Sequence, residues 1–195
     1  PFFGKYWPEG VPKQLDYDYS LTLLDILRDT TEKYPQNQAI WFLDGWITYS
    51  ELYHHVCSFA SSLHDLGVEK GDVVALHLPN SPQYIVAYYA ITSLGAIVTG
   101  VNPQYKPLEI LHQLKITNAK YIIGLDALFK HYIEPILSKW NFTKIIITNL
   151  LDMATGLSSL KKILAKIIKK VPSAKIRGDN VIQFKKLLKN SKCLP

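Results

Sequence analysis

Residues 66–101, LGVEKGDVVALHLPNSPQYIVAYYAITSLGAIVTGV, carry the pattern of a strand, a helix and a second strand. The apolar run Val73–Leu78 is short, which is typical of a strand covered on both faces in a parallel sheet. Asn80 is expected to cap the helix that follows, and Pro82 falls in its first turn, where a missing amide hydrogen costs little. Ala96–Val101 predicts the second strand. The stretch therefore predicts two parallel strands joined by a helix.

The alternation of strands and helices continues to residue 148. Short apolar runs alternate with helix-length segments, which is typical of a parallel sheet with right-handed crossovers. The sequence therefore predicts a doubly wound, mainly parallel α/β sheet with helices on both faces, built by residues 20–150. The further elements expected are a helix at Pro107–Thr117, a strand at Tyr121–Ile123, a helix at Leu125–Ser138 and a strand at Lys144–Thr148.

Two capping boxes predict where the upstream helices begin. Thr22 precedes a helical pattern of leucines and isoleucine, and Asp25 stands three residues later, where its carboxylate can accept from the backbone of Thr22. Pro35 is expected to end this helix, because proline lacks an amide hydrogen and clashes with the preceding turn. Thr48 and Glu51 form the second box, which opens a long helix.

The N-terminal region also contains a predicted hairpin and a predicted arm. Asp44-Gly45 indicates a tight turn between two short strands. Residues 1–19 show no hydrophobic period and are rich in aromatic residues, proline and glycine. We expect them to form an extended arm laid over another surface, because side chains as large as Phe2 and Trp7 are costly to expose.

Residues 151–195 form a basic tail. Residues 160–195 carry 11 basic side chains and one acidic one, whereas residues 1–159 carry 11 basic and 15 acidic ones, so the net charge of +6 belongs to the tail. Apolar residues recur at helical spacing over 157–171, with lysines on the other side of the predicted helix. These lysines are Lys161, Lys162, Lys166, Lys169 and Lys170. A short strand at Val181-Ile182 and a final helix from Phe184 to Leu188 are expected to complete the subdomain.

The amphipathic stretch 157–171 has two interpretations. We expect it to pack on the domain with its lysines solvated; the alternative is a helix on an anionic membrane surface. Because the positive charge is local, the sequence predicts no nucleic-acid partner. No apolar run approaches the roughly 20 residues of a spanning helix, and no signal segment precedes Pro1. We therefore expect a cytoplasmic protein with membrane-peripheral attachment as the alternative, and a start at Pro1 suggests a fragment.

Few residues are candidates for chemistry. His77 ends a predicted strand, at the edge where open parallel sheets bind ligands, although a core or rim histidine is the expected outcome. Glu109 and His112 stand three residues apart on a helix, a spacing found in carboxylate metal sites, but no second pair accompanies them. His54 and His55 point about 100° apart and cannot easily share a metal ion. The sequence therefore assigns no catalytic, cofactor-binding or metal-binding residue.

Several familiar site motifs are absent from the sequence. The ten glycines form no GxGxxG or GxxxxGK[ST] phosphate loop, and neither GxSxG nor HExxH occurs. Cys57 is expected to be a buried thiol in a helical pattern. Cys193 is the only other cysteine, and the two form neither a metal signature nor a disulfide framework.

Five segments, in order, resemble motifs of the adenylate-forming enzymes, which include acyl-CoA synthetases, aryl-CoA ligases and luciferases. Together they span residues 48–105, roughly 30% of the chain, and their order and spacing make a chance resemblance improbable. The aromatic arm and the basic stretch before Phe184 look most like the medium- and long-chain fatty-acid branch. The segments are Thr48–Leu52 for TYxEL, Leu66–Ala75 for GVxxGDxVAL, Leu78–Tyr84 for LPNSPEF, Ala90–Val98 for AxxxxGAVV and Val101–Tyr105 for xNPxY.

The resemblance implies a two-step reaction in a full-length enzyme. A carboxylate attacks the α-phosphate of ATP to give an acyl-adenylate and pyrophosphate, and CoA then displaces AMP; Mg²⁺ would stabilise the phosphoryl charge. The family's phosphate loop, ribose-binding acid and C-terminal lysine have no counterpart in these residues. We therefore expect the incomplete first N-terminal subdomain, truncated before the phosphate loop, inactive alone and with no cofactor bound.

Other roles stay open at this point. The chain is alternatively a stand-alone, non-catalytic paralogue that acts as a binding or dimerisation module. The resemblance also implies a homodimer contact through the arm 1–19, since relatives often dimerise through N-terminal segments, and a fatty acid as the substrate of the full-length enzyme. Lys161 and Lys162 are weak candidates for contact with the CoA nucleotide, because some relatives place basic residues there. A further alternative is a membrane contact made by residues 157–171.

Overall fold

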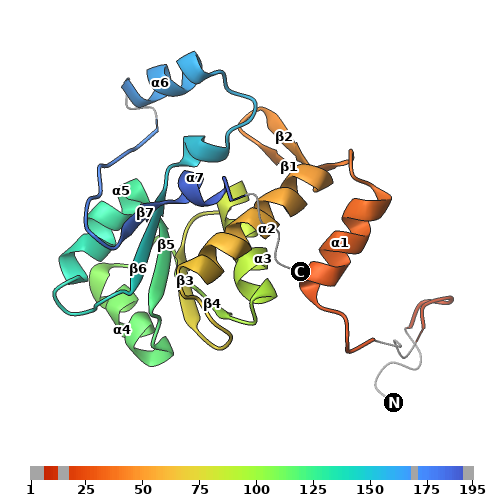
Figure 1. The fold of residues 1–195 in the computed structure, drawn as a ribbon, viewed down its shortest axis with the longest axis horizontal. Coiled ribbons are helices and arrows are strands. Elements are labelled where there is room, and N and C mark those ends of the chain that lie inside the picture. The colour runs from red at the N-terminus through yellow and green to blue at the C-terminus, as the bar shows by residue number, and fades with distance from the viewer. Residues whose placement is uncertain (1–6, 13–17, 168–170, 191–195) are drawn as a thin grey trace.

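The centre of the molecule is a five-stranded sheet in which every neighbouring pair of strands is parallel (Figure 1). The fold is described from a computed structural model, which describes residues 7–12, 18–167 and 171–190. The strand order is β4-β3-β5-β6-β7. The strands are β3 (Val73–His77), β4 (Ile97–Gly100), β5 (Tyr121–Leu125), β6 (Lys144–Thr148) and β7 (Val181–Gln183).

This strand order confirms the predicted doubly wound sheet. The chain moves from β3 outward to β4, returns to place β5 on the other side of β3, and then continues in the same direction to β6 and β7. The direction of winding therefore reverses once, between β3 and β5. Figure 1 shows helices on both sides of the sheet, with α4 and α5 on one side and α2 and α3 on the other.

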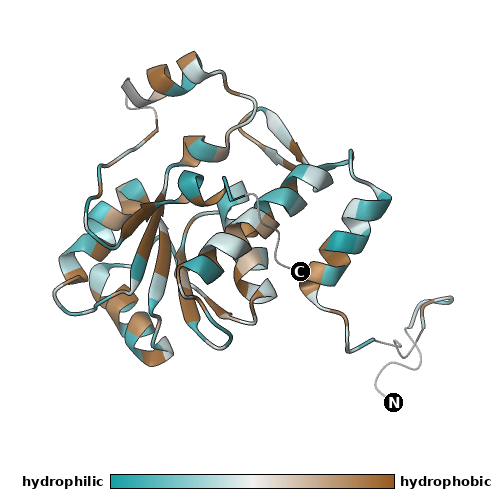
Figure 2. Ribbon diagram, in the orientation of Figure 1, coloured by the Kyte–Doolittle hydropathy of each residue, from teal (hydrophilic) through white to brown (hydrophobic). Residues whose placement is uncertain are grey.

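The helices form two layers that cover the two faces. Along β3, Val74 and Leu76 pack in one hydrophobic cluster with α2 and α3, whereas Ala75 belongs to a second cluster with α4 and the helical turns after β5. This alternation is the period of two of a strand covered on both faces. Figure 2 shows the hydrophobic colour concentrated on the sheet. The layers contain α2 (Tyr49–Asp65), α3 (Pro82–Ser93), α4 (Pro107–Thr117), α5 (Asp126–Leu128), the π-helix η1 (Phe129–Ile133), the 3₁₀ helix η2 (Glu134–Ile136) and α7 (Phe184–Leu187).

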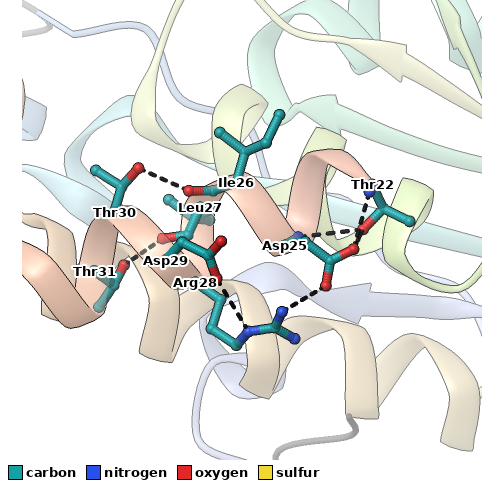
Figure 3. A network of polar contacts seen from close by, with 8 residues as sticks. All are labelled: Thr22, Asp25, Ile26, Leu27, Arg28, Asp29, Thr30 and Thr31. Atoms are coloured by element: carbon teal, nitrogen blue, oxygen red, sulfur yellow. Dashed lines mark hydrogen bonds and ion pairs between the residues drawn. The ribbon is translucent and has the colours of Figure 1, made fainter. Parts of the chain in front are cut away.

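Both predicted capping boxes are confirmed. At the start of α1 (Leu23–Lys33), Thr22 Oγ1 accepts from the Asp25 amide at 3.2 Å, and Asp25 Oδ2 accepts from the Thr22 amide at 2.9 Å (Figure 3). Arg28 holds the other oxygen of Asp25 at 2.8 Å. Thr48 and Glu51 make the same reciprocal pair before α2. Each box supplies partners for amides that a helix start would otherwise leave unpaired.

Two local predictions are wrong by a single residue. The residue that caps α3 is Ser81 rather than Asn80, since the Ser81 hydroxyl accepts from the Tyr84 amide at 3.4 Å. The hairpin of β1 (Gln38–Phe42) and β2 (Gly45–Thr48) turns at Leu43 and Asp44, whose φ angles are 46° and 58°. Positive φ at both turn residues is the pattern of a type I′ turn, whose twist matches that of the strands.

The helix predicted over Leu125–Ser138 is not continuous. The segment forms α5, one turn of π-helix and one turn of 3₁₀ helix in succession. Pro135 explains the break, because it has no amide hydrogen to donate and its ring clashes with the turn before it. The π-helical turn places Phe129 and Ile133 in the second hydrophobic cluster.

The basic tail returns to the body after a short excursion. Its elements are the 3₁₀ helix η3 (Leu150–Met153) and α6 (Ser159–Ile167), followed by β7 and α7. The rings of Phe184 in α7 and Phe59 in α2 lie 4.3 Å apart, and both side chains are fully buried. Ser62 donates to the Leu187 carbonyl at 2.8 Å. The tail therefore contributes the last strand of the sheet and part of its core.

The start of the excursion lies against the β1–β2 hairpin. Thr155 Oγ1 donates to the Trp46 carbonyl at 3.0 Å, and the backbones of Gly45 and Gly156 approach so closely that a side chain on either would clash. An alanine methyl group at Gly45 would meet the Gly156 backbone, which cannot rotate away as a side chain can.

We predict that Gly45→Ala lowers the free energy of unfolding by about 2 kcal/mol or more, because the two backbones must separate. Urea unfolding followed by circular dichroism measures the change. Gly124→Ala is the matched control: its added methyl would lie at 3.6 Å from the His77 carbonyl, an ordinary contact. Equal losses in the two variants would show that the hairpin contact is not the cause.

Candidate functional site

The carboxyl edge of the sheet is the candidate functional site. In open parallel sheets, ligands bind outside the carboxyl ends of the strands, near the point where the winding reverses. Here that edge contains His77 at the end of β3, Asp126 directly after β5, and Thr148 and Asn149 at the end of β6. All four side chains are buried, with at most 7% of their surface exposed.

Asp126 is the centre of the polar network at this edge. One carboxylate oxygen accepts from the Ala127 amide at 2.7 Å, and the other accepts from the Ala174 amide at 3.1 Å. The Asn149 side-chain amide donates to both oxygens, at 3.1 and 3.3 Å, and also to the Pro172 carbonyl at 3.2 Å. These bonds join the ends of β5 and β6 to the segment that leads from α6 to β7.

A second carboxylate and a buried amide extend this network. Asp152 Oδ2 accepts from the Thr148 hydroxyl at 3.0 Å and from the Asn149 amide at 2.9 Å. Gln83, in the first turn of α3, donates to the Asn149 carbonyl at 2.9 Å. Its Oε1 atom is buried and has no partner among the described residues. A buried acceptor without a donor costs free energy, so this is a position where a donor would be stabilising.

A pocket of about 560 Å³ opens beside the network. Its walls combine the two carboxylates with cationic side chains, Lys175 and Arg177, on the segment before β7. The carboxylates already accept hydrogen bonds from the chain, which leaves them poorly placed to act as a base or a metal ligand. Across the described ranges, no three His, Cys, Asp or Glu side chains gather closely enough to hold a metal ion. The hydrogen bonds of the arrangement connect the ends of β5 and β6 to the segment before β7.

His77 lies at the predicted edge but is sealed inside it. The side chain is 0% exposed, and neither ring nitrogen has a hydrogen-bond partner among the described residues. Its ring meets Tyr132 of η1 edge to face, with the centroids 6.4 Å apart. Burial lowers the pKa of His77 to about 4. A core histidine was expected; the structure adds that it is unsatisfied, so it destabilises the site rather than serving it.

The remaining candidates from the sequence do not assemble into a site. Glu109 is the capping partner of α4, since it accepts from the Lys106 amide at 2.7 Å, and His112 next to it is exposed. The rings of His54 and His55 are 6.0 Å apart and tilted by 50°. Burial is the main cause of a lowered pKa at His55, and the charge of the neighbouring His54 lowers it further.

Cys57 and the described tail lysines do not form a functional site either. Cys57 is buried as predicted, but it is disulfide-bonded rather than a free thiol, so that part of the prediction is wrong. Lys161 is exposed on α6, away from the carboxyl edge, and Lys162 lies beside it. Lys169 and Lys170 lie outside the described residues, as do most of the residues of the predicted arm 1–19.

The five sequence motifs form turns and caps around the sheet. Gly71 has a φ of 87° in the turn before β3, where a residue with a side chain would be strained. Asp72, which follows it, forms an ion pair with Lys120 at 2.7 Å. Burial alone would raise the pKa of Asp72, but hydrogen bonds from Lys120 and the Glu69 amide lower it. These motif residues therefore position strands and carry no chemistry of their own.

Comparison with known proteins fits these observations. The family model described as AMP-binding enzyme matches residues 27–184. The chain belongs to this family. The long-chain-fatty-acid–CoA ligase of Escherichia coli O157:H7 is 32% identical over 186 residues, which are 94% of this chain and 33% of that protein. The chain therefore spans about a third of the length of the curated relatives it matches.

Solved structures of AMP-binding enzymes share the fold. A benzoate CoA ligase from Burkholderia xenovorans LB400 matches with a TM-score of 0.60 and 20% identity, over 80% of this chain and 30% of that one. The N-terminal subdomain of NpsA from Klebsiella oxytoca, solved with anthranilyl-AMSN, matches with a TM-score of 0.51 and 28% identity, over 52% of this chain and 27% of that one. The predicted family and fold class are confirmed.

The polar network at the carboxyl edge was missed by the sequence analysis. Gln83 stands inside the quoted motif Leu78–Tyr84, yet nothing in the motif indicates that its side chain crosses to β6. Asp126, Asn149 and Asp152 each follow directly on, or within four residues of, the end of a predicted strand. Polar residues at that position, where parallel strands end together, were the available signal.

We predict that His77→Met raises the free energy of unfolding at neutral pH by about 1–2 kcal/mol, because it replaces an unsatisfied buried polar group with an apolar one of similar length. The wild-type protein should also lose stability as the pH falls, because the unfolded chain takes up a proton near pH 6.5 while the folded chain resists until about 4. Over that window the loss should reach about 3 kcal/mol relative to the variant. Parallel stability curves for the two proteins, from urea unfolding at several pH values, would contradict the assignment.

We predict that Asp126→Ala costs about 2–4 kcal/mol of stability, because the amides of Ala127, Ala174 and Asn149 lose their shared acceptor. Tryptic cleavage around Lys175 should also become faster, since the segment before β7 loses its attachment. Glu134→Ala, at an exposed glutamate, is the control for removing one negative charge. Indistinguishable unfolding and cleavage of the two variants would show that the network does not hold this segment.

Proposed function

We propose that these residues form the N-terminal part of a fatty-acid–CoA ligase, an acid–thiol ligase of the long-chain acyl-CoA synthetase type. Such an enzyme converts ATP, a carboxylic acid and CoA into acyl-CoA, AMP and pyrophosphate through an acyl-adenylate. The observation that carries the proposal is the 32% identity over 94% of this chain to a relative named long-chain-fatty-acid–CoA ligase. The family match over residues 27–184 supports the same reaction class.

The described residues do not fit a site for ATP with Mg²⁺. The carboxylates at the carboxyl edge accept hydrogen bonds from the chain, and no metal-sized cluster of ligands exists in the described part. No step of the reaction is therefore assigned to them. In the proposal, ATP, CoA and Mg²⁺ act in the full-length enzyme, and this part supplies a scaffold: a sheet whose edges are fixed by turns, caps and the Asp126 network.

Several predictions about organisation and partners remain part of this proposal. The chain divides into the arm 1–19, an α/β subdomain 20–150 and the tail 151–195, which supplies the last strand and helix. A fatty acid is the substrate of the full-length enzyme, the arm is a candidate homodimer contact, and residues 157–171 are a candidate peripheral membrane contact. No helix within the described ranges is both long and apolar enough to span a membrane. A cytoplasmic location is part of the proposal.

The test compares two forms of the protein. The full natural polypeptide that contains these residues should release pyrophosphate from ATP in the presence of Mg²⁺ and a long-chain fatty acid, and should then form acyl-CoA. Residues 1–195 alone should form neither product, because the described part has no group for the chemistry. Pyrophosphate release by residues 1–195 alone would contradict the scaffold role.

The alternative of a stand-alone, non-catalytic module has its own outcome. In that case the natural reading frame would end near Pro195, and no form of the protein would release pyrophosphate. The described residues give that alternative one favourable observation: the family motifs here support the sheet whether or not a catalytic part is attached.

A further inference from the structure

Helix α6 stands apart from the rest of the molecule. Figure 1 shows it at the margin, and the described residues 154–158 before it and 171–180 after it contain no helix. Leu160, Ile163 and Leu164 are 75%, 56% and 54% exposed. The expected packing of this helix on the domain is therefore wrong: its apolar side chains face solvent. A hollow of about 230 Å³ lies between α6 and the residues of η3 and α7 beneath it.

Both ends of the excursion are fixed to buried structure. Before α6, Thr155 is bonded to the Trp46 carbonyl, and Gly156 lies against the hairpin backbone. After α6, the Pro172 carbonyl and the Ala174 amide are bonded to Asn149 and Asp126 at the carboxyl edge. The described chain is therefore attached to the hairpin before α6 and to the carboxyl edge after it.

The exposed apolar residues form one stripe. Positions 160, 163 and 164 are spaced by three and four residues, which places them on the same side of a helix. Lys161 is exposed beside the stripe, and Lys162 lies on the side away from it. An apolar stripe with a lysine at its border fits a helix that lies in the plane of a membrane surface.

The charge of the surrounding chain indicates which kind of surface would contact the stripe. Residues 160–195 carry 11 basic side chains and one acidic one. A dry contact with an apolar protein surface would bury Lys161 without a partner, which is costly. Nucleic acid would satisfy the lysines but leave the leucines in water. A bilayer with anionic headgroups accepts both, because the apolar residues enter the acyl boundary while the lysines meet phosphates.

We propose that α6 docks on an anionic lipid surface, with Leu160, Ile163 and Leu164 inserted below the headgroups and Lys161 beside them at headgroup level. This deepens the membrane contact included in the proposed function by naming the inserted face and the lipid charge. It depends on the exposed stripe and the clamped ends of the excursion, and it concerns binding alone.

The experiment measures co-sedimentation of the full natural polypeptide with vesicles of phosphatidylcholine and phosphatidylglycerol, and with vesicles of phosphatidylcholine alone. We expect binding to the anionic vesicles to be clearly the stronger. The double variant Leu160→Gln with Leu164→Gln should weaken that binding about tenfold, and the charge reversal Lys161→Glu should also weaken it about tenfold.

Each variant has a matched control elsewhere on the surface. Leu108→Gln with Ile116→Gln changes two residues of α4 that are 71% and 69% exposed, and Lys115→Glu makes the same charge change at another exposed lysine. Both controls should bind like the wild type, and every variant should keep its melting temperature. Equal loss in variant and control, or equal binding to the two kinds of vesicle, would overturn the proposal.

Other occupants of the stripe give distinct results. If the rest of the polypeptide covers it, the leucine variant would lower the melting temperature and leave vesicle binding unchanged. If a second copy covers it, the same variant would reduce the molecular mass in solution. Loss of binding to a single-stranded oligonucleotide, with vesicle binding intact, would assign the lysines to nucleic acid. Each of these outcomes rejects the lipid proposal, and none bears on acyl-CoA formation, which is measured separately in the absence of vesicles.

Discussion

The carboxylate of Asp126 ties together three parts of the chain at the carboxyl edge of the sheet. It lies directly after β5, binds the side chain of Asn149 after β6, and accepts from the Ala174 amide on the way to β7. Because β7 pairs only with β6 in the sheet, its place depends on the return of the chain from α6. The same network attaches the chain that returns from α6 to the carboxyl edge.

The carboxyl edge also contains two groups that the fold leaves unpaired. Gln83 has a buried carbonyl oxygen without a donor, and His77 has two ring nitrogens without partners in the described structure. Together they lower the stability of an edge where Asp126, Asn149 and Asp152 are hydrogen-bonded. Both lie at the ends of elements that flank the reversal of winding between β3 and β5, the region where open sheets of this kind admit ligands.

Local signals in the sequence predicted much of the fold. Apolar runs marked every strand of the sheet, and both capping boxes stand where residue types and spacing placed them. Errors arose where two adjacent residues could each fill a role, as with Asn80 and Ser81, or where Pro135 interrupts an otherwise helical pattern. The polar network could not be predicted, because Asp126 and Ala174 are 48 residues apart and only the completed sheet brings them together. For the same reason the amphipathic pattern of α6 revealed its stripe but not the side it faces.

The packing of Phe184 against Phe59 has a consequence for synthesis on the ribosome. Ser62 and Leu187, which share a hydrogen bond in the same contact, are 125 residues apart. At ordinary rates of translation, α2 would wait on the order of 10 s before α7 is made. Until then the side of α2 around Phe59 lacks its cover, and the outer side of β6 has no neighbouring strand. The nascent chain therefore passes through an interval in which an apolar helix face and an open strand edge are both available to chaperones or to other chains.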